Sequence, residues 1–182
     1  MRSIDRLRHE HDVILRALDV LDAAARRLEA GQPVAPDVFT RLVDFFRTYA
    51  DACHHIKEET VLFPKLEERG MPRDGGPIGV MLYEHDEGRA LVKTVAAATA
   101  ELSSGPAAAG RLATAAREFS SLLRGHIDKE NHVLFMMAER LLAGADGQVD
   151  DAFAEQEASV MKAGEHDRYE ALVKQLAGEL SA

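Results

Sequence analysis

HHIKEETVLFP, residues 54–64, is the stretch that decides the fold, because the chain carries a near copy of it, HIDKENHVLF, at residues 126–135. In both copies a histidine stands four residues before a glutamate, and Val-Leu-Phe follows that glutamate. Residues four apart lie on one face of an α-helix, so each copy places an imidazole beside a carboxylate. The repeat therefore predicts two helices that present equivalent His/Glu pairs.

Turn residues divide the rest of the chain into long segments that show no β-alternation. The breaks are GQPVAP at 31–36, GMPRDGGP at 70–77, SSGPAAAG at 103–110 and GADGQ at 144–148. Glycine and proline interrupt helices most strongly. The expected helices cover Ser3–Ala30, Pro36–Arg69, Pro77–Leu102, Ala107–Leu142 and Asp150–Leu180. Pro64 falls late in the second segment and should kink or end it.

Short breaks between long helices predict an all-α fold, an antiparallel up-down-up-down four-helix bundle with an additional C-terminal helix packed against it. We expect one domain over residues 1–182, with the bundle core at about 3–142 and the C-terminal helix at about 150–180. The 182 residues are enough for one sizeable core.

Charge and cysteine content narrow the possible partners and compartment. The net charge is −9, which argues against nucleic-acid binding, because that function needs a basic face. No apolar run approaches the roughly 18 residues of a membrane span, so we expect no membrane partner. The single cysteine, Cys53, excludes an internal disulfide and favours a reducing cytoplasm. We expect Cys53 to act as a small buried apolar residue.

Helical periodicity turns several histidines toward the core. His11, His85 and His126 lie within the apolar stripes of the first, third and fourth segments, and Glu130 sits at the centre of the last stripe. A glutamate in a core is costly unless a cation or a hydrogen-bond donor compensates it. One buried His–Glu hydrogen bond would explain a single pair. Inward histidines on four helices instead favour a metal site.

The second segment leaves its register open. His54 with Glu58 and His55 with Glu59 both have the spacing of a pair on one face. The apolar pattern upstream favours the pair at 55 and 59, whereas the match to His126 and Glu130 favours the pair at 54 and 58. A local π-bulge would shift the helical phase and reconcile them. We give the repeat more weight and expect the other pair to form supporting hydrogen bonds or a solvated edge.

A second short motif, Glu-His-Asp, occurs at residues 10–12, 84–86 and 165–167. With its first two copies, the chain shows the same order twice: one histidine followed by a His/Glu pair. The order is His11, then His54 and Glu58; and His85, then His126 and Glu130. Two such halves would build a nearly symmetric site in which two carboxylates can bridge two metal ions.

These motifs together resemble the hemerythrin-like (HHE cation-binding) family. The matching stretches are EHD at 10–12, HHIKEETVLFP at 54–64, GPIGVMLYEHDEGR at 77–90 and HIDKENHVLF at 126–135. The resemblance covers about residues 4–142 and implies a four-helix bundle around two non-haem iron ions, a di-iron centre with an oxo or hydroxo bridge. It implies Glu58 and Glu130 as bridging ligands. The terminal ligands that it implies are His11, His54, His85 and His126.

The chain departs from the respiratory hemerythrins at one histidine. Those proteins carry five histidines, two of them one turn apart on the third helix, whereas Met81 and Arg89 flank His85 here. His166, in the third Glu-His-Asp motif, is the candidate for the fifth histidine ligand, although a surface or hydrogen-bonded role fits it equally well. The sequence is also similar to the bundle domain of the di-iron proteins that repair iron–sulfur clusters.

Three functions follow from this resemblance. The first is a binding protein whose di-iron site takes up O2, NO or peroxide for storage, scavenging or sensing. The second is an enzyme that uses the same site to decompose peroxide, reduce NO or deliver iron for iron–sulfur repair. The third is a metal-stabilised bundle that senses iron or binds a protein partner. Stable ligand adducts without turnover would favour the first, and catalytic loss of peroxide or NO the second. Metal-dependent folding without reactivity toward small molecules would favour the third.

Overall fold

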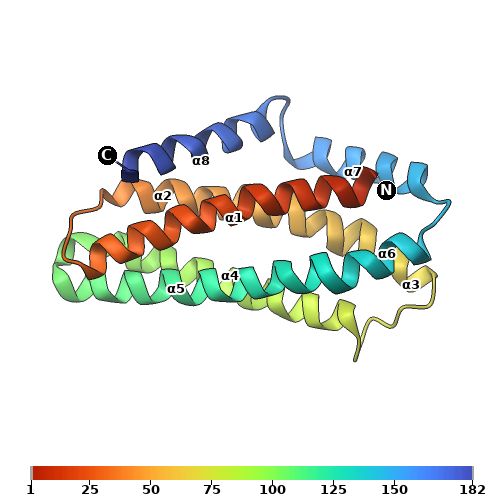
Figure 1. Ribbon diagram of the computed structural model, residues 1–182, viewed down its shortest axis with the longest axis horizontal. Helices are drawn as coiled ribbons and strands as arrows, with labels where there is room; N and C mark the ends of the chain where they lie inside the picture. Colours follow the sequence, from red (N-terminus) through yellow and green to blue (C-terminus); the bar gives the residue numbers. More distant parts are fainter. Residues whose placement is uncertain (1, 182) are drawn as a thin grey trace.

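The computed structural model describes residues 2–181, apart from the side chains of residues 146 and 181, and the described chain is all-helical (Figure 1). The α-helices are α1 (Arg2–Glu29), α2 (Pro36–Phe45), α3 (Phe63–Glu68), α4 (Pro77–Ala100), α5 (Pro106–Lys129), α6 (Phe135–Leu141), α7 (Asp146–Val160) and α8 (Glu165–Ser181). Three π-helical stretches, η1 (Phe46–His55), η2 (Glu58–Leu62) and η4 (Glu130–Leu134), and one 3-10 turn, η3 (Leu102–Ser104), complete it.

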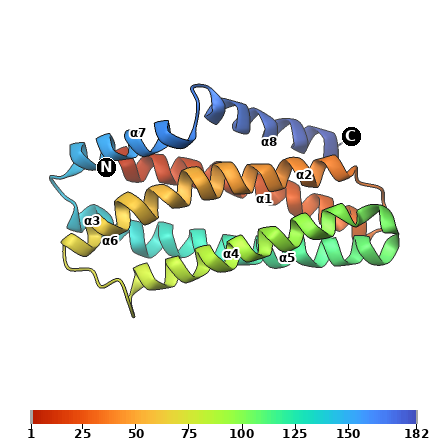
Figure 2. The ribbon, with the colours of Figure 1, turned by 180° about the vertical axis from the view of Figure 1, so that it is seen from behind.

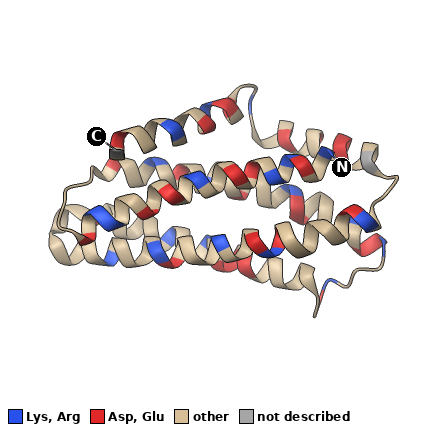
Figure 3. Ribbon diagram, in the orientation of Figure 1, with Lys and Arg blue, Asp and Glu red and all other residues tan. Residues whose placement is uncertain are grey.

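The helices join into four long rods that lie side by side. α1 is the first rod, α2 through α3 the second, α4 the third, and α5 through α6 the fourth; each runs opposite to the one before it (Figures 1 and 2). α5 packs against α1 and α4, and α2 packs against α4. The predicted bounds of these four segments agree with the observed ones to within two residues. Acidic and basic residues are interspersed along the outer helices (Figure 3).

Pro64 does not end the second rod. It falls in the first turn of α3, directly after η2, and the helix continues to Glu68. A proline lacks only a hydrogen bond that a first helical turn leaves unmade in any case. Of the two predicted effects, a kink or an end, the end of the segment at Pro64 is therefore wrong.

The π-helical stretches lie where the His/Glu motifs lie. A π-helix bonds each N–H to the carbonyl five residues earlier, so one turn takes in more residues than an α-helical turn. In η1 this wider turn lets the neighbours His54 and His55 both be buried. The proposed π-bulge is confirmed, and it explains why upstream periodicity and the internal repeat disagree about the register.

The C-terminal segment consists of two helices, not the single additional helix that the sequence predicts. α7 ends at Val160 because Met161 is extended, and α8 starts after Gly164, whose φ of +83° favours glycine. Both helices pack on α1 (Figure 2). The apolar pattern breaks at Gly164 in the sequence, which marks the same point.

The interior contains two apolar clusters. One, centred on Leu18, Phe39 and Phe119, fills the half of the rods near α2 and α8; the other, centred on Leu62 and Phe135, fills the half near α3, α6 and α7. Buried histidines and glutamates belong to neither cluster. No helix in the described part of the chain is long and apolar enough to cross a membrane.

Candidate metal centre

Six of the predicted ligands meet in the interior of the four rods. Their ligand atoms form two overlapping groups, in each of which all atoms lie within 4.8 Å of one another. Both groups contain Glu58 and Glu130. One adds His11 and His54, and the other adds His85 and His126. None of the six side chains is more than 1% exposed. Of the two alternative pairs, the one that the repeat favours, His54 with Glu58, therefore lies in the centre.

Each carboxylate lies between one histidine from each group. Glu58 Oε1 is 3.7 Å from His54 Nε2, and its Oε2 is 3.5 Å from His85 Nε2. Glu130 Oε2 is 3.1 Å from His11 Nε2 and 3.2 Å from the Nε2 of His126. Each carboxylate is therefore common to both groups of ligand atoms.

His55 joins the second group. Its ring stacks on that of His85 with centroids 4.0 Å apart, and it meets the ring of His126 edge-on at 5.5 Å. The ligand atoms of His55, His85 and His126 also lie within 4.8 Å of one another. From the sequence, a π-bulge was expected to shift the register from one histidine to the other, whereas the observed π-helix buries both His54 and His55.

A hydrogen bond from the outer nitrogen fixes the orientation of each of the four paired histidines. His54 Nδ1 donates to Glu10 at 2.7 Å and His85 Nδ1 donates to Glu59 at 2.7 Å. The two remaining bonds join His126 Nδ1 to Glu84 at 3.1 Å and His11 Nδ1 to Asn131 Oδ1 at 2.9 Å. In its neutral form each imidazole would carry its proton on Nδ1 and direct the Nε2 lone pair inward, as metal-ligating histidines do.

The inward-facing atoms lack hydrogen-bond partners, and this tests whether the residues fit a metal. Both oxygens of Glu58 and of Glu130, and Nε2 of His85, are buried without a partner of hydrogen-bond geometry. His54 Nε2 and His11 Nε2 lie 2.9 Å apart, so if both rings carry their proton on Nδ1, neither nitrogen can donate to the other. Buried polar groups are otherwise almost always satisfied. A cation between these atoms would satisfy them all, so the donor set fits a metal.

Without a metal, the two carboxyls have opposite protonation preferences. Burial and the negative charge of Glu130 raise the pKa of Glu58 well above its ordinary value. Burial also disfavours ionisation of Glu130, but the charge of His126 and the contact with His11 outweigh it and hold the pKa of Glu130 well below its ordinary value. Two close buried carboxylates cannot both ionise cheaply.

Two lysines anchor the supporting carboxylates, and they repeat between the halves of the chain. Lys57, fully buried, pairs with Glu10, and Lys129 pairs with Glu84. Each lysine precedes a central glutamate in sequence, and each anchored glutamate is the first residue of a Glu-His-Asp motif. That residue supports a histidine of another helix, not its own neighbour. The sequence repeat is thus a repeat of contacts, including those of Glu59 and Asn131.

His166 lies outside this centre, which corrects the expectation that it supplies a ligand there. Its Nε2 is 3.3 Å from Cys53 Sγ and 3.6 Å from Glu157 Oε1. These groups and Glu10 are close together, but the ammonium of Lys57 already pairs with both acids, 3.4 Å from Glu157. The cause is the break before α8, which places His166 beside η1 instead of within the four rods.

Comparison with known proteins adds the family. The family model of the hemerythrin HHE cation-binding domain matches residues 2–138. The iron-sulfur cluster repair protein YtfE of Salmonella schwarzengrund is 34% identical over 149 residues, and its Escherichia coli O139:H28 counterpart is 31% identical over 148. Each alignment covers 79% of this chain and 63% of the relative, so the match leaves over a third of the relative's length uncovered. No solved structure gave a significant match. With most of its length and its buried His/Glu repeat inside the matched region, the chain belongs to the hemerythrin HHE cation-binding domain family.

Proposed function

We propose that this protein holds two non-haem iron ions in an up-down-up-down four-helix bundle and binds a small molecule such as O2 or NO there. The observation that carries the proposal is the sharing of Glu58 and Glu130 by two buried four-ligand groups. Two carboxylates with histidines on either side are the donor set of a two-metal site, and imidazole with carboxylate suits iron.

The structure suggests how the ligands divide. His11 and His54 would hold one ion, and His85 and His126 the other, with Glu58 and Glu130 common to both. His55 is our candidate for the fifth histidine, on the ion of His85 and His126. The two sides then differ in their number of histidines, so the pair of ions would keep a coordination position open for an added ligand.

The surrounding residues hold this donor set in place. Glu10, Glu59 and Glu84 fix three imidazoles by hydrogen bonds, and Lys57 and Lys129 anchor two of these acids. The apolar clusters on both sides keep bulk water away. An iron pair in such a site would supply the electrons that O2 or NO binding needs. The protein would position the ligands, fix the tautomer of each imidazole and exclude bulk water.

A second candidate is a role in the repair of iron–sulfur clusters. The relatives that carry this name match 79% of the chain. The same centre would then release or accept iron instead of holding a gas. Transfer of iron to a cluster-free acceptor protein, measured against iron loss to a chelator alone, would separate delivery from binding.

Metal analysis with an optical spectrum tests the main proposal. Protein purified with iron should contain about two irons per chain and show a ferric absorption that azide changes, because azide occupies an open position. NO or O2 should then give an adduct that decays without consuming further gas. Folded protein that takes up no iron and no other transition metal would contradict the proposal.

His55 and His166 provide a matched pair of variants for the ligand assignment. His55→Ala should reduce iron retention under a competing chelator and shift the ferric spectrum, because it removes a donor beside His85. His166→Ala should leave both unchanged, because His166 contacts Cys53 and Glu157 instead. The reverse result would return His166 to the centre.

A further inference from the structure

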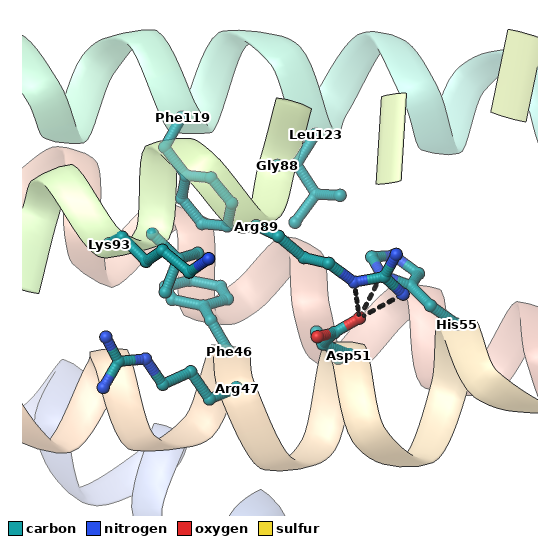
Figure 4. Close-up of a pocket in the computed structure, with 11 residues that line it drawn as sticks. Phe46, Arg47, Asp51, His55, Gly88, Arg89, Lys93, Phe119 and Leu123 are labelled. Carbon is teal, nitrogen blue, oxygen red and sulfur yellow. Dashed lines mark hydrogen bonds and ion pairs between the residues drawn. The ribbon is translucent and has the colours of Figure 1, made fainter. Parts of the chain in front are cut away.

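A cavity of about 160 Å³ lies beside the proposed metal centre, between η1, α4 and α5 (Figure 4). Its wall is mostly apolar: Phe46, Val92, Phe119 and Leu123 line it, with the backbone of Gly88 between them. It is partly enclosed and partly open to solvent. An apolar cavity of about 150 Å³ is large enough to hold benzene or xenon, so this one has ample room for a diatomic molecule.

The cavity reaches the edge of the centre at His55. His55 lines it, and the ring of His55 stacks on His85. His55 is 6% exposed, whereas the six histidines and glutamates of the two four-residue groups are at most 1% exposed. The residual accessibility of the buried His/Glu group is therefore on this side. Figure 4 places His55 at one end of the cavity and the exposed side chains of Arg47 and Lys93 at the other.

The charges at the inner end are already paired. Arg89 contacts Asp51 at 2.8 Å and Glu59 at 2.6 Å. Asp51 also faces His55 Nδ1 at 3.5 Å. Arg89 is therefore not free to pair with an anion that passes Arg47 and Lys93 at the outer end, and any ion would lose its hydration against the phenyl rings. A neutral, weakly hydrated molecule meets neither obstacle.

We propose that this cavity is the entry path and waiting site for neutral diatomic molecules, O2 or NO, on their way to the metal centre. The inference rests on the proposed function and adds to it a route by which its neutral ligands reach the centre. Gly88 is the residue that keeps the path open. A Cβ there would meet only Leu122 Cδ2, at 3.9 Å, so a larger side chain can be built without a backbone clash. It would occupy cavity space.

The kinetic test compares Gly88→Leu with the unmodified iron-loaded protein in rapid-mixing measurements of NO binding. A narrowed path slows entry and exit alike, so association and dissociation rates should both fall by about tenfold or more while the affinity stays within about twofold. Gly88→Ala should lower both rates by a smaller factor. This variant replaces Gly88→Leu in the test if the leucine variant does not fold.

Gly110→Leu is the matched control, because Gly110 lies in α5 and a Cβ added there would meet nothing within 4 Å. Its rates should equal those of the unmodified protein. Unchanged rates in both Gly88 variants would overturn the entry path. So would a change in dissociation alone, which would indicate altered ligand stabilisation at the metal.

A crystal of the unmodified protein under xenon pressure tests the cavity without reference to iron. Xenon should appear against Phe46 and Phe119, and a cavity without xenon would overturn the inference. Xenon binding in protein that takes up no iron would instead contradict the proposed function while supporting the cavity's preference for small apolar molecules. The two failures are thus distinguishable.

Discussion

Glu58 and Glu59 are neighbours in the sequence, and both approach the histidines, but from opposite sides. Glu58 lies among the Nε2 atoms of the buried histidines. Glu59 instead accepts a hydrogen bond from His85 Nδ1 and forms an ion pair with Arg89. Burial differs accordingly, with Glu58 fully buried and Glu59 partly exposed. At the scale of single residues, a ligand and its support are therefore separated by one position.

Glutamine variants should separate these two roles. Glu58→Gln should abolish binding of two metals, because an amide cannot bridge them as a carboxylate does. Glu59→Gln should keep two metals but weaken their affinity by about 10- to 100-fold, because His85 loses its anionic hydrogen-bond acceptor. Metal content and chelator competition measure both. Equal losses in the two variants would contradict the assignment.

The raised pKa of Glu58 predicts a pH dependence in the metal-free protein. Burial and Glu130 raise this pKa above 4.5, the ordinary value that the unfolded chain retains. Between these two values the folded state keeps a proton that the unfolded state releases. The stability that depends on this proton is fully present below pH 4.5 and is lost as the pH rises toward the folded-state pKa.

Glu58→Gln removes that titration. Without metal, the free energy of unfolding of the variant should exceed that of the unmodified protein by a margin that widens as the pH rises above 4.5. Urea unfolding in the presence of a chelator, at several pH values between about 4 and 8, measures it. A margin that is constant with pH would contradict the raised pKa.

At the scale of elements, the decisive feature is the change of helical winding at the ligands. The two glutamates Glu58 and Glu130 each begin a π-helical stretch, and η1 ends at His55. An α-helix would turn one of two adjacent histidines away from the core. π-helical turns cost backbone hydrogen-bond geometry and are frequent at functional sites. In the second rod, the π-helical turn buries His55 in addition to the His/Glu pair that this rod shares with the fourth rod.

The link between α7 and α8 yields an element-scale prediction. Gly164 has a φ of +83°, so Gly164→Ala should lower the free energy of unfolding by about 1–2 kcal/mol. Gly178 lies within α8 with nothing within 4 Å of an added Cβ, so Gly178→Ala should raise it by about 0.5–1 kcal/mol. Denaturant unfolding of both variants checks the opposite signs. Two effects of the same sign would contradict this account.

At the scale of the whole molecule, the polar centre separates two apolar clusters, each of which draws on several rods. α7 and α8 extend both clusters, with Phe153 in one and Tyr169 in the other. The fold therefore has hydrophobic support on both sides of the centre that does not depend on metal. This differs from small domains that are unfolded without their ion.

Removal of metal should accordingly leave a folded but weaker protein. We expect far-ultraviolet circular dichroism to keep its helical signal after chelation, while the unfolding midpoint falls, because a ligand that binds only the folded state stabilises it. Amide hydrogen exchange should accelerate most around η1, η2 and η4. Complete loss of helix on chelation, or an unchanged midpoint, would contradict this prediction.

Periodicity and the internal repeat were sufficient to predict four helical segments and the convergence of His11, His54, His85, His126, Glu58 and Glu130, because both depend on local spacing. They gave opposite answers for His54 and His55, because periodicity favoured one and the repeat favoured the other. That both are buried depends on a π-helix whose distortion only surrounding contacts can maintain. The supporting roles of Glu10 and Glu84 were equally out of reach, because each acts across to another helix. Their place in the Glu-His-Asp motifs was the available signal.

The sequence by itself determined the all-helical fold, the family resemblance and the central donor set, since apolar spacing and short motifs are properties of neighbouring residues. Only the tertiary structure decided that His54 and His55 are both buried, that His166 lies beside Cys53, and that a cavity lined by Phe46 and Phe119 reaches His55. These features arise where helices distant in sequence pack together, and packing depends on the whole chain.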